Sequence, residues 1–275
     1  MPTVSTNGIE MYYERKGSGE PLLLVPGLLF GAEHWRPQLD VLASDYDVIA
    51  VDLRGQYHTT TTEEQAGYDM WNQMEDVYGL IQALGIAPTH YAGLSMGGFI
   101  GMRMALKHPE VLRDLILIDT QAGPEEPEKA EMYAAMRQIW RAGQFEALTS
   151  ALPRSFFPDD FIDNHADQVD AWIARLREND PEGSPRASQG VDERDDILGR
   201  VGEIRVPTLV AHGTEDVPIE IEKGELLASL IPGARFVRIE GAGHQSNVDH
   251  PDEVTALIKD FLADVRQGAA AGSAG

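Results

Sequence analysis

Short apolar runs alternate along the chain with longer segments in which apolar residues recur every three or four positions. The apolar runs are typical of strands in a parallel sheet that helices cover on both faces, because such strands have no polar side. They comprise residues 21–27, 46–52, 89–94, 114–119, 207–213 and 234–241. A hairpin with strands over 3–6 and 9–17 precedes them, since Asn7-Gly8 is a favoured two-residue turn.

Helical periodicity predicts what lies between these strands. One apolar face recurs at helical spacing through Trp71, Met74, Tyr78, Ile81 and Leu84. Another helix is predicted directly after residue 95, and two more over 221–231 and 251–265. Strands that alternate with helices in this way predict an α/β fold, with a mostly parallel central sheet flanked by helices.

One long segment, residues 121–196, breaks the alternation, because it contains no strand-like run. Its helical patterns occupy 127–143, 145–152 and 164–179. Stretches rich in Pro, Gly and acidic residues bracket these patterns. We therefore predict a helical cap over 121–196, inserted between strands of a core that comprises 1–120 and 197–267. The small residues of 268–275 predict a flexible tail.

Acidic residues outnumber basic ones by 45 to 22, which gives a formal net charge of −23. Such a field repels nucleic acid and anionic lipid, so we expect no nucleic-acid or membrane partner and a monomer or small homo-oligomer. The absence of cysteine excludes disulfides, iron–sulfur clusters and thiol catalysis. No apolar stretch approaches the length of a membrane span, and residues 1–17 lack the pattern of a signal peptide, so the expected location is the cytoplasm.

Ser95 lies in the sequence GLSMGG (residues 93–98), between a predicted strand and a predicted helix. In that context a G-x-S-x-G pattern indicates a nucleophile elbow, a sharp turn that holds the serine in a strained backbone conformation. Side chains at 93 or 97 would collide with the neighbouring backbone, so the turn needs glycine there. The serine also precedes a helix N-terminus, which favours negative charge nearby. Ser95 is therefore the candidate nucleophile.

A serine nucleophile needs a base, and the chain has eight histidines. In open α/β sheets the working groups lie in loops at the carboxyl ends of the strands. His244 fits this position best, because it follows the last predicted strand in the glycine-rich sequence GAGH. His58 and His212 are the alternatives, although His212 lies within an apolar run and is expected to pack there or to bond to the backbone.

The base in turn needs a carboxylate that fixes its tautomer and stabilises the imidazolium ion. Asp216, in the sequence HGTEDVPI, follows a predicted strand and precedes a Val-Pro turn that would rigidify it. Asp119, at the end of another strand, and Glu215 are the alternatives. The order Ser95, Asp216, His244 along the chain is that of elbow enzymes.

Taken together, these motifs resemble those of the α/β-hydrolase superfamily, and within it the group of lidded serine esterases, enol-lactonases and cofactor-free haloperoxidases (perhydrolases). The resemblance covers residues 6–120 and 197–266 and rests on LLLVPG, VDLRG, GLSMGG, HGTEDVPI and GAGH. It implies the α/β-hydrolase fold, with the helical cap between core strands. It also implies that the backbone N–H groups of Leu28 and Met96 form an oxyanion hole.

Two positions depart from the family's pattern. Pro26 stands where a histidine usually precedes the glycine of the oxyanion loop, and Gln56-Tyr57-His58 replaces the usual His-Gly after DLRG. Neither departure touches the predicted triad. Both alter the walls near the oxyanion loop.

The resemblance implies a serine hydrolase that opens a carboxylic ester or lactone of a small, largely apolar substrate through an acyl-enzyme. Perhydrolysis or cleavage of a carbon–carbon bond by the same triad is the alternative, and a ligand-binding protein with little turnover is a further one. No pair of histidines has the spacing of metal ligands on a helix or loop, so neither a metal nor another cofactor is expected.

The expected substrate contacts lie beside the oxyanion loop and in the cap. They are Leu29, Met136, Trp140 and Phe157. Apolar contacts of this kind predict a preference for uncharged short or medium acyl groups. Arg137, Arg141 and Arg154 are the residues that would bind a substrate carboxylate if the enzyme accepted one.

Overall fold

The computed structural model, which describes the backbone of residues 2–272 and the side chains of residues 2–268, is built on an eight-stranded sheet. The strands are β1 (Thr3–Thr6), β2 (Ile9–Gly17), β3 (Glu20–Val25), β4 (Tyr46–Val51), β5 (Thr89–Leu94), β6 (Leu112–Ile118), β7 (Thr208–Gly213) and β8 (Arg235–Ile239). Their order in the sheet is β1-β2-β4-β3-β5-β6-β7-β8. The β1–β2 and β2–β4 pairs are antiparallel, and all the other pairs are parallel.

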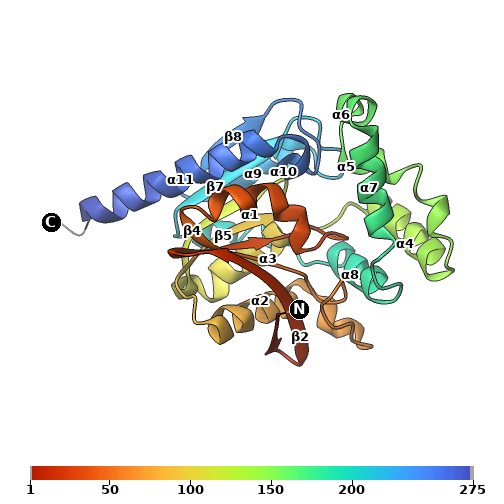
Figure 1. The fold of residues 1–275 in the computed structure, drawn as a ribbon, viewed down its shortest axis with the longest axis horizontal. Coiled ribbons are helices and arrows are strands. Elements are labelled where there is room, and N and C mark those ends of the chain that lie inside the picture. Colours follow the sequence, from red (N-terminus) through yellow and green to blue (C-terminus); the bar gives the residue numbers. More distant parts are fainter. Residues whose placement is uncertain (1, 273–275) are drawn as a thin grey trace.

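Helices connect the strands and cover both faces of the sheet (Figure 1). The core helices are α1 (Arg36–Leu42), α2 (Met70–Leu84), α3 (Met96–Lys107), α9 (Ile221–Leu230), α10 (Ser246–Asp249) and α11 (Pro251–Gly272), with the 3-10 helices η1 (Ala32–Trp35), η2 (Gln65–Tyr68), η3 (Pro109–Val111) and η5 (Val201–Glu203). On one face α2, α3 and α9 pack through residues such as Met74, Phe99 and Leu227. On the other, α1 and α11 pack through residues such as Leu39 and Ile258. Burial on both faces explains why the central strands are continuous apolar runs.

The helices between β6 and β7 form a separate group beside the core (Figure 1). They are α4 (Pro127–Arg141), α5 (Leu152–Phe156), α6 (Asp159–Asn164), α7 (Ala166–Leu176) and α8 (Gly183–Asp192), with the 3-10 helix η4 (Phe145–Ala147). We refer to residues 121–196 as the cap. An apolar cluster that includes Trp140 and Phe156 of the cap continues into Leu29 and Phe30 of the core. Apolar burial therefore docks the cap on the core.

The helices of the cap differ in detail from those predicted. Residues 183–192 form α8, although their Pro and Gly content favoured a bracketing loop. Pro185 is compatible with this helix because it lies in the first turn, where backbone N–H groups have no intrahelical acceptor. Residues 145–152, predicted as one helix, contain only η4 and the first residue of α5.

The C-terminal helix α11 is longer than predicted. It continues through Gly272, past residue 268, where the sequence placed the start of a flexible tail. Alanine has the highest helix propensity, which accounts for this extension. The last residues of the predicted tail, 273–275, lie outside the described residues. No helix in the described part of the chain combines the length and the apolar composition that a membrane span needs.

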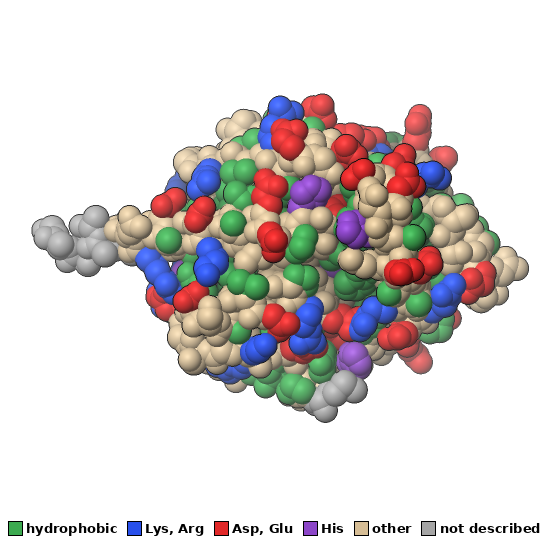
Figure 2. Space-filling model, turned by 45° about the horizontal axis from the view of Figure 1, so that its top comes forward, with side chains coloured by type: hydrophobic (Ala, Val, Ile, Leu, Met, Phe, Trp, Pro, Cys, Tyr) green, Lys and Arg blue, Asp and Glu red, His purple; other side chains and the backbone are tan. Residues whose placement is uncertain are grey.

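Acidic side chains spread across the face of the molecule shown in Figure 2, with Lys and Arg side chains among them. Ion pairs also tie the cap to the core. Lys129 of α4 donates to the carbonyl oxygen of Pro218 at 2.8 Å and pairs with Glu220 at 2.7 Å. Lys223 of α9 pairs with Glu126 at 2.7 Å. The cap is thus held by charges at its edge as well as by apolar contacts.

Candidate active site

Ser95 occupies the turn between β5 and α3 in a strained conformation, with φ 51° and ψ −111°. The surrounding backbone leaves room only for glycine. A Cβ on Gly93 would lie 2.4 Å from the carbonyl carbon of Gly97, and a Cβ on Gly97 would lie 2.3 Å from the carbonyl oxygen of Val25. Helix α3 begins directly after the serine, so its first N–H groups have no intrahelical acceptor. This is the geometry of a nucleophile elbow.

Three side chains from three loops form a continuous hydrogen-bonded chain. Ser95 Oγ lies 3.0 Å from His244 Nε2, and His244 Nδ1 lies 2.8 Å from Asp216 Oδ2. Ser95 follows β5, Asp216 follows β7 and His244 follows β8, so all three lie beyond the carboxyl ends of strands. All three residues are buried. The structure thus brings together the three residues selected from the sequence.

The histidine and the aspartate of this chain stabilise each other's charge. Burial alone would lower the pKa of His244, but the Asp216 carboxylate outweighs burial and raises that pKa above the ordinary value of 6.5. Burial alone would raise the pKa of Asp216, but the charge of His244 and hydrogen bonds from His212 and His244 hold it below the usual 3.8. Asp216 is therefore ionised at neutral pH, and His244 Nδ1 carries the proton that it donates to Asp216.

Asp119, the alternative carboxylate, has other partners. Its Oδ1 accepts from the Gly213 backbone N–H at 2.8 Å, and its Oδ2 accepts from Ser246 Oγ at 2.6 Å. Burial raises the pKa of Asp119 to about 7, because the opposing charge of His212 does not compensate for it. The pKa values of the two buried carboxyl groups are thus shifted in opposite directions, and Asp216 is the one that contacts His244.

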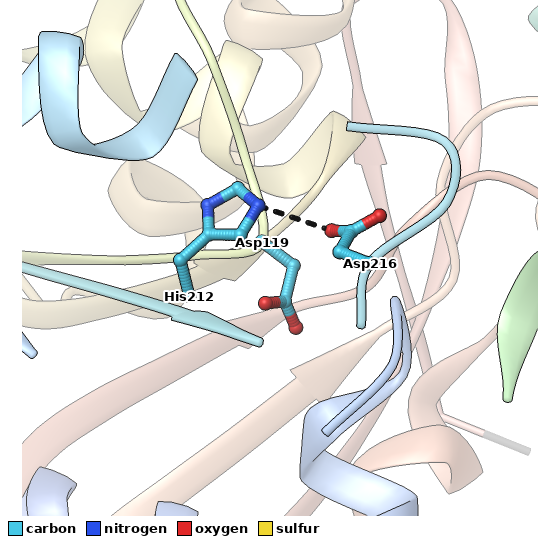
Figure 3. A group of neighbouring side chains, drawn as sticks. All are labelled: Asp119, His212 and Asp216. Atoms are coloured by element: carbon cyan, nitrogen blue, oxygen red, sulfur yellow. Dashed lines mark ion pairs between the residues drawn. The ribbon is translucent and has the colours of Figure 1, made fainter. Parts of the chain in front are cut away.

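His212, an alternative base, lies behind Asp216 rather than beside Ser95. Figure 3 shows its imidazole facing the Asp216 carboxylate, with Asp119 next to both. His212 Nε2 donates to the carbonyl oxygen of Ile219 at 2.8 Å and lies 3.2 Å from Asp216 Oδ2. Asp119, His212 and Asp216 each offer one potential metal-ligand atom, and these atoms lie within 4.8 Å of one another. Both carboxylates and His212 Nε2 already have protein partners, with which a cation there would have to compete.

His58 and Glu215, which were also candidates for the base and the acid, lie outside this hydrogen-bonded chain. His58 is half exposed and pairs with Asp52, with its Nδ1 2.9 Å from Asp52 Oδ2. Glu215 is exposed, although it neighbours Asp216 in the same loop. Neither side chain lines the cavity described below.

The two predicted oxyanion donors belong to residues near Ser95. Met96 is the first residue of α3, and Leu28 follows Gly27, where a Cβ would lie 3.4 Å from the Ser95 Cβ. No backbone carbonyl among the described residues accepts a hydrogen bond from the Met96 or Leu28 amide. Both amides are therefore free to bind an oxyanion formed on a carbonyl that Ser95 attacks.

The oxyanion loop is the segment 26–29, which carries the Leu28 amide. It is held by three residues that were not predicted for the site. Leu29 has φ 71°, and its backbone N–H donates to Gln56 Oε1. Its carbonyl oxygen accepts from Tyr57 Oη and from Asn179 Nδ2, both at 3.0 Å. Gln56 and Tyr57 are the residues that depart from the family's pattern after DLRG, and that departure was the signal that could have identified them. Asn179 belongs to the cap, which thereby contributes to the position of this loop.

A cavity lies over Ser95 and His244, between the core and the cap. Most of its surface is apolar. Its apolar lining includes Leu28, Leu29, Met136, Trp140, Leu148 and Phe156. Three of the four predicted contacts therefore line it, whereas Phe157 does not. Phe157 is buried against Phe161 instead, with their ring centroids 5.1 Å apart, and its neighbour Phe156 reaches the cavity.

Comparisons with known proteins show the family and the fold of this chain. Residues 20–251 match the family model described as alpha/beta hydrolase fold. The chain is 28% identical to a putative carbamate hydrolase, RutD, from Azorhizobium caulinodans, over 97% of this chain and all of that protein. Two solved structures are also similar. A thermophilic esterase from Thermogutta terrifontis is 31% identical, with a TM-score of 0.88 over 96% of this chain and 97% of that one. An enol-lactonase from Burkholderia xenovorans LB400 is 28% identical, with a TM-score of 0.88 over 95% of this chain and all of that one.

Proposed function

The chain belongs to the alpha/beta hydrolase fold family, and from that premise we propose that it cleaves a carboxylic ester or lactone through an acyl-enzyme formed on Ser95. The observation that carries the proposal is the hydrogen-bonded chain from Ser95 through His244 to Asp216, which lies under an apolar cavity. Asp216 holds the imidazole in the tautomer whose Nε2 accepts a proton. Leu28 and Met96 supply the oxyanion donors.

In the first half of the reaction Ser95 Oγ attacks the carbonyl carbon of the substrate, and His244 Nε2 takes the hydroxyl proton. The carbonyl oxygen becomes an oxyanion, which the N–H groups of Leu28 and Met96 bind. The imidazolium then gives its proton to the leaving alcohol oxygen as the carbon–oxygen bond breaks. In the second half water gives a proton to His244 and attacks the acyl carbon. The bond between that carbon and Ser95 Oγ then breaks as His244 returns the proton to Oγ, which releases the acid and restores Ser95.

The proposal predicts a specific pH dependence. His244 must be neutral to accept the Ser95 proton, so activity should be full at alkaline pH and fall as the pH decreases through the His244 pKa. Because Asp216 raises that pKa, the inflection in kcat/KM should lie above 6.5. A pH–rate profile measures it. Asp119→Asn is the matched control. Asp119 does not contact His244, but its charge also raises the His244 pKa, so this variant should shift the inflection to lower pH without removing it. If the acid limb disappears in that variant, Asp119 sets the profile and this assignment is wrong.

The apolar lining predicts how activity depends on acyl chain length. Each added methylene that the cavity buries is worth at most ~0.8 kcal/mol, or about fourfold in kcat/KM, so activity should rise through short and medium chains until the cavity is filled. A series of p-nitrophenyl esters from acetate to octanoate measures this. Trp140→Ala should flatten the rise, because Trp140 lines the cavity. A chain-length profile that is flat in the wild type would contradict the apolar cavity as the acyl site.

A wider panel, which adds lactones, diketones and hydrogen peroxide to the ester series, separates the alternative functions. A ligand-binding protein would turn over none of the esters. A perhydrolase would form peracid from the acyl-enzyme when hydrogen peroxide replaces water, and a carbon–carbon bond hydrolase would prefer diketones. A matched carbamate belongs in the panel, because a relative of this chain carries the name carbamate hydrolase. We expect esters and lactones to have the highest kcat/KM.

A further inference from the structure

One end of the cavity is polar, and α8 supplies most of it. Ser184, Ser188 and Asp192 are spaced four residues apart along α8, so their side chains share one face of the helix. All three line the cavity. This face is polar, whereas most of the cavity surface is apolar, and the proposed acyl chemistry at Ser95 does not use it.

Arg137 reaches the same end of the cavity from α4, which packs against α8. Its Nη1 bonds to Asp192 Oδ2 and lies 3.3 Å from Ser188 Oγ. The two charged side chains are 12% and 4% exposed. Solvent and salt screen a pair at this depth only weakly, so the charge of Asp192 largely cancels that of Arg137.

The remaining carboxylate of the lining is paired as well. Glu125 bonds to Arg194 at 3.0 Å, and both side chains are buried. Among the described residues that line the cavity, Glu125, Arg137 and Asp192 are the Asp, Glu, Lys and Arg residues, and each has an oppositely charged partner. The polar end of the cavity therefore carries no net charge, although it contains charged groups.

Ser184 supplies a hydrogen-bonding group that protein atoms leave unused. Its side chain is fully buried, and no hydrogen-bond partner for its Oγ occurs within the described residues. Buried hydroxyl groups normally have a partner, because leaving one without costs free energy. Since Ser184 lines the cavity, a ligand in the cavity is in a position to satisfy it.

We infer that this polar end binds a neutral hydrogen-bonding group of the substrate, such as a hydroxyl or an amide, and that Asp192 excludes carboxylates by keeping Arg137 paired. The inference rests on the proposed ester or lactone hydrolysis and adds the class of substrate. A neutral group bonds to Ser184 and to the serine and arginine donors beside it without disturbing the charges. A carboxylate would either displace Asp192 or remain buried without a cation, and both are unfavourable.

A set of esters with the same chain and different ends tests this inference. The p-nitrophenyl esters carry hexanoyl, adipamoyl and adipoyl groups, which end in a methyl, an amide and a carboxylate. The wild type should favour the amide over the carboxylate by at least about tenfold in kcat/KM. Asp192→Asn, which frees the charge of Arg137, should raise kcat/KM for the carboxylate ester relative to that for the amide ester by about tenfold or more. Ser184→Ala should lower kcat/KM for the ester that ends in an amide relative to that for the ester that ends in a methyl group.

Two controls show whether the pair itself is responsible. Glu193→Gln removes the same formal charge from an exposed neighbour of Asp192, and it should leave all the ratios within twofold. Arg137→Met leaves Asp192 unpaired, so it should favour an aminohexanoyl ester, whose end is a cation. This variant also tests the inference if Asp192→Asn does not fold. A wild type that favours the carboxylate, or ratios that neither pair variant changes, would overturn the inference.

A binding measurement separates this inference from the proposed function. Calorimetry with hexanoate and with adipate on Ser95→Ala and on Ser95→Ala/Asp192→Asn requires no turnover. One carboxylate of either ligand can bind at the Leu28 and Met96 amides, so only the second protein should gain affinity for adipate relative to hexanoate. If the wild type hydrolyses none of the esters but this difference appears, the proposed function fails and the selection against carboxylates stands. If the esters are hydrolysed and no difference appears in the ratios or in binding, only the inference fails.

Discussion

Ser95→Ala should reduce kcat for the best ester by at least ~10⁴-fold and leave folding unchanged. The variant removes the only atom that forms the acyl bond, while alanine tolerates the backbone of the elbow as well as serine does. Steady-state kinetics measure the loss, and the thermal unfolding midpoint checks the fold. A fluorophosphonate probe should label Ser95 in the wild type, as mass spectrometry of the peptides would show.

The reference variants for this experiment are Ser229→Ala and the pair Ser95→Ala/His244→Ala. Ser229 is exposed on α9 and its hydroxyl caps a local carbonyl, so its removal should leave kcat unchanged. The double variant should be no less active than Ser95→Ala alone, because members of a triad act as one unit. Turnover by Ser95→Ala close to that of the wild type, or labelling of another residue, would end the serine-hydrolase proposal.

Asp216→Asn should cost about 10³- to 10⁴-fold in kcat. The amide N–H of an asparagine can donate to His244 Nδ1, which favours the wrong imidazole tautomer, with its proton on Nε2. The amide also carries no charge that would stabilise the imidazolium ion. The loss should appear in kcat more than in KM, because the carboxylate acts on the transition state. Steady-state kinetics at alkaline pH measure it without interference from His244 protonation.

Two neighbouring acids provide the comparison. Glu215→Gln changes an exposed carboxylate in the same loop and should leave kcat nearly unchanged. Asp119→Asn should have a smaller effect than Asp216→Asn, because Asp119 bonds to Gly213 and Ser246 rather than to His244. If Asp119→Asn costs more than Asp216→Asn, the orienting carboxylate has been misassigned.

The strands and the three residues of the hydrogen-bonded chain could be predicted from the sequence for physical reasons. A strand covered on both faces must be apolar along its length, as in β4, where all six residues are buried. Ser95, Asp216 and His244 each follow such a strand, and the topology of a parallel sheet brings strand ends to one edge. Local sequence therefore determined a non-local arrangement.

The residues that form the walls of the cavity could not be predicted from the sequence in the same way. Phe156 and Phe157 are adjacent, and α5 ends between them, so a change of one residue in the end of the helix decides which ring faces the cavity. Arg137 and Asp192 are 55 residues apart on two cap helices, and only the packing of α4 on α8 reveals that they pair. These features depend on side-chain direction and helix packing, which periodicity alone does not specify.

The assembly of the site from both ends of the fold has a consequence for the newly made chain. Ser95 and His244 are 149 residues apart, and His244 follows β8, the last strand and the one at the edge of the sheet. A chain that emerges from the ribosome N-terminus first exposes its serine long before the base exists. The elbow is therefore chemically silent during synthesis, and reactivity begins only when β8 pairs with β7. If the proposed function holds, the chain thus cannot turn over an ester until β8 has been made and has joined the sheet.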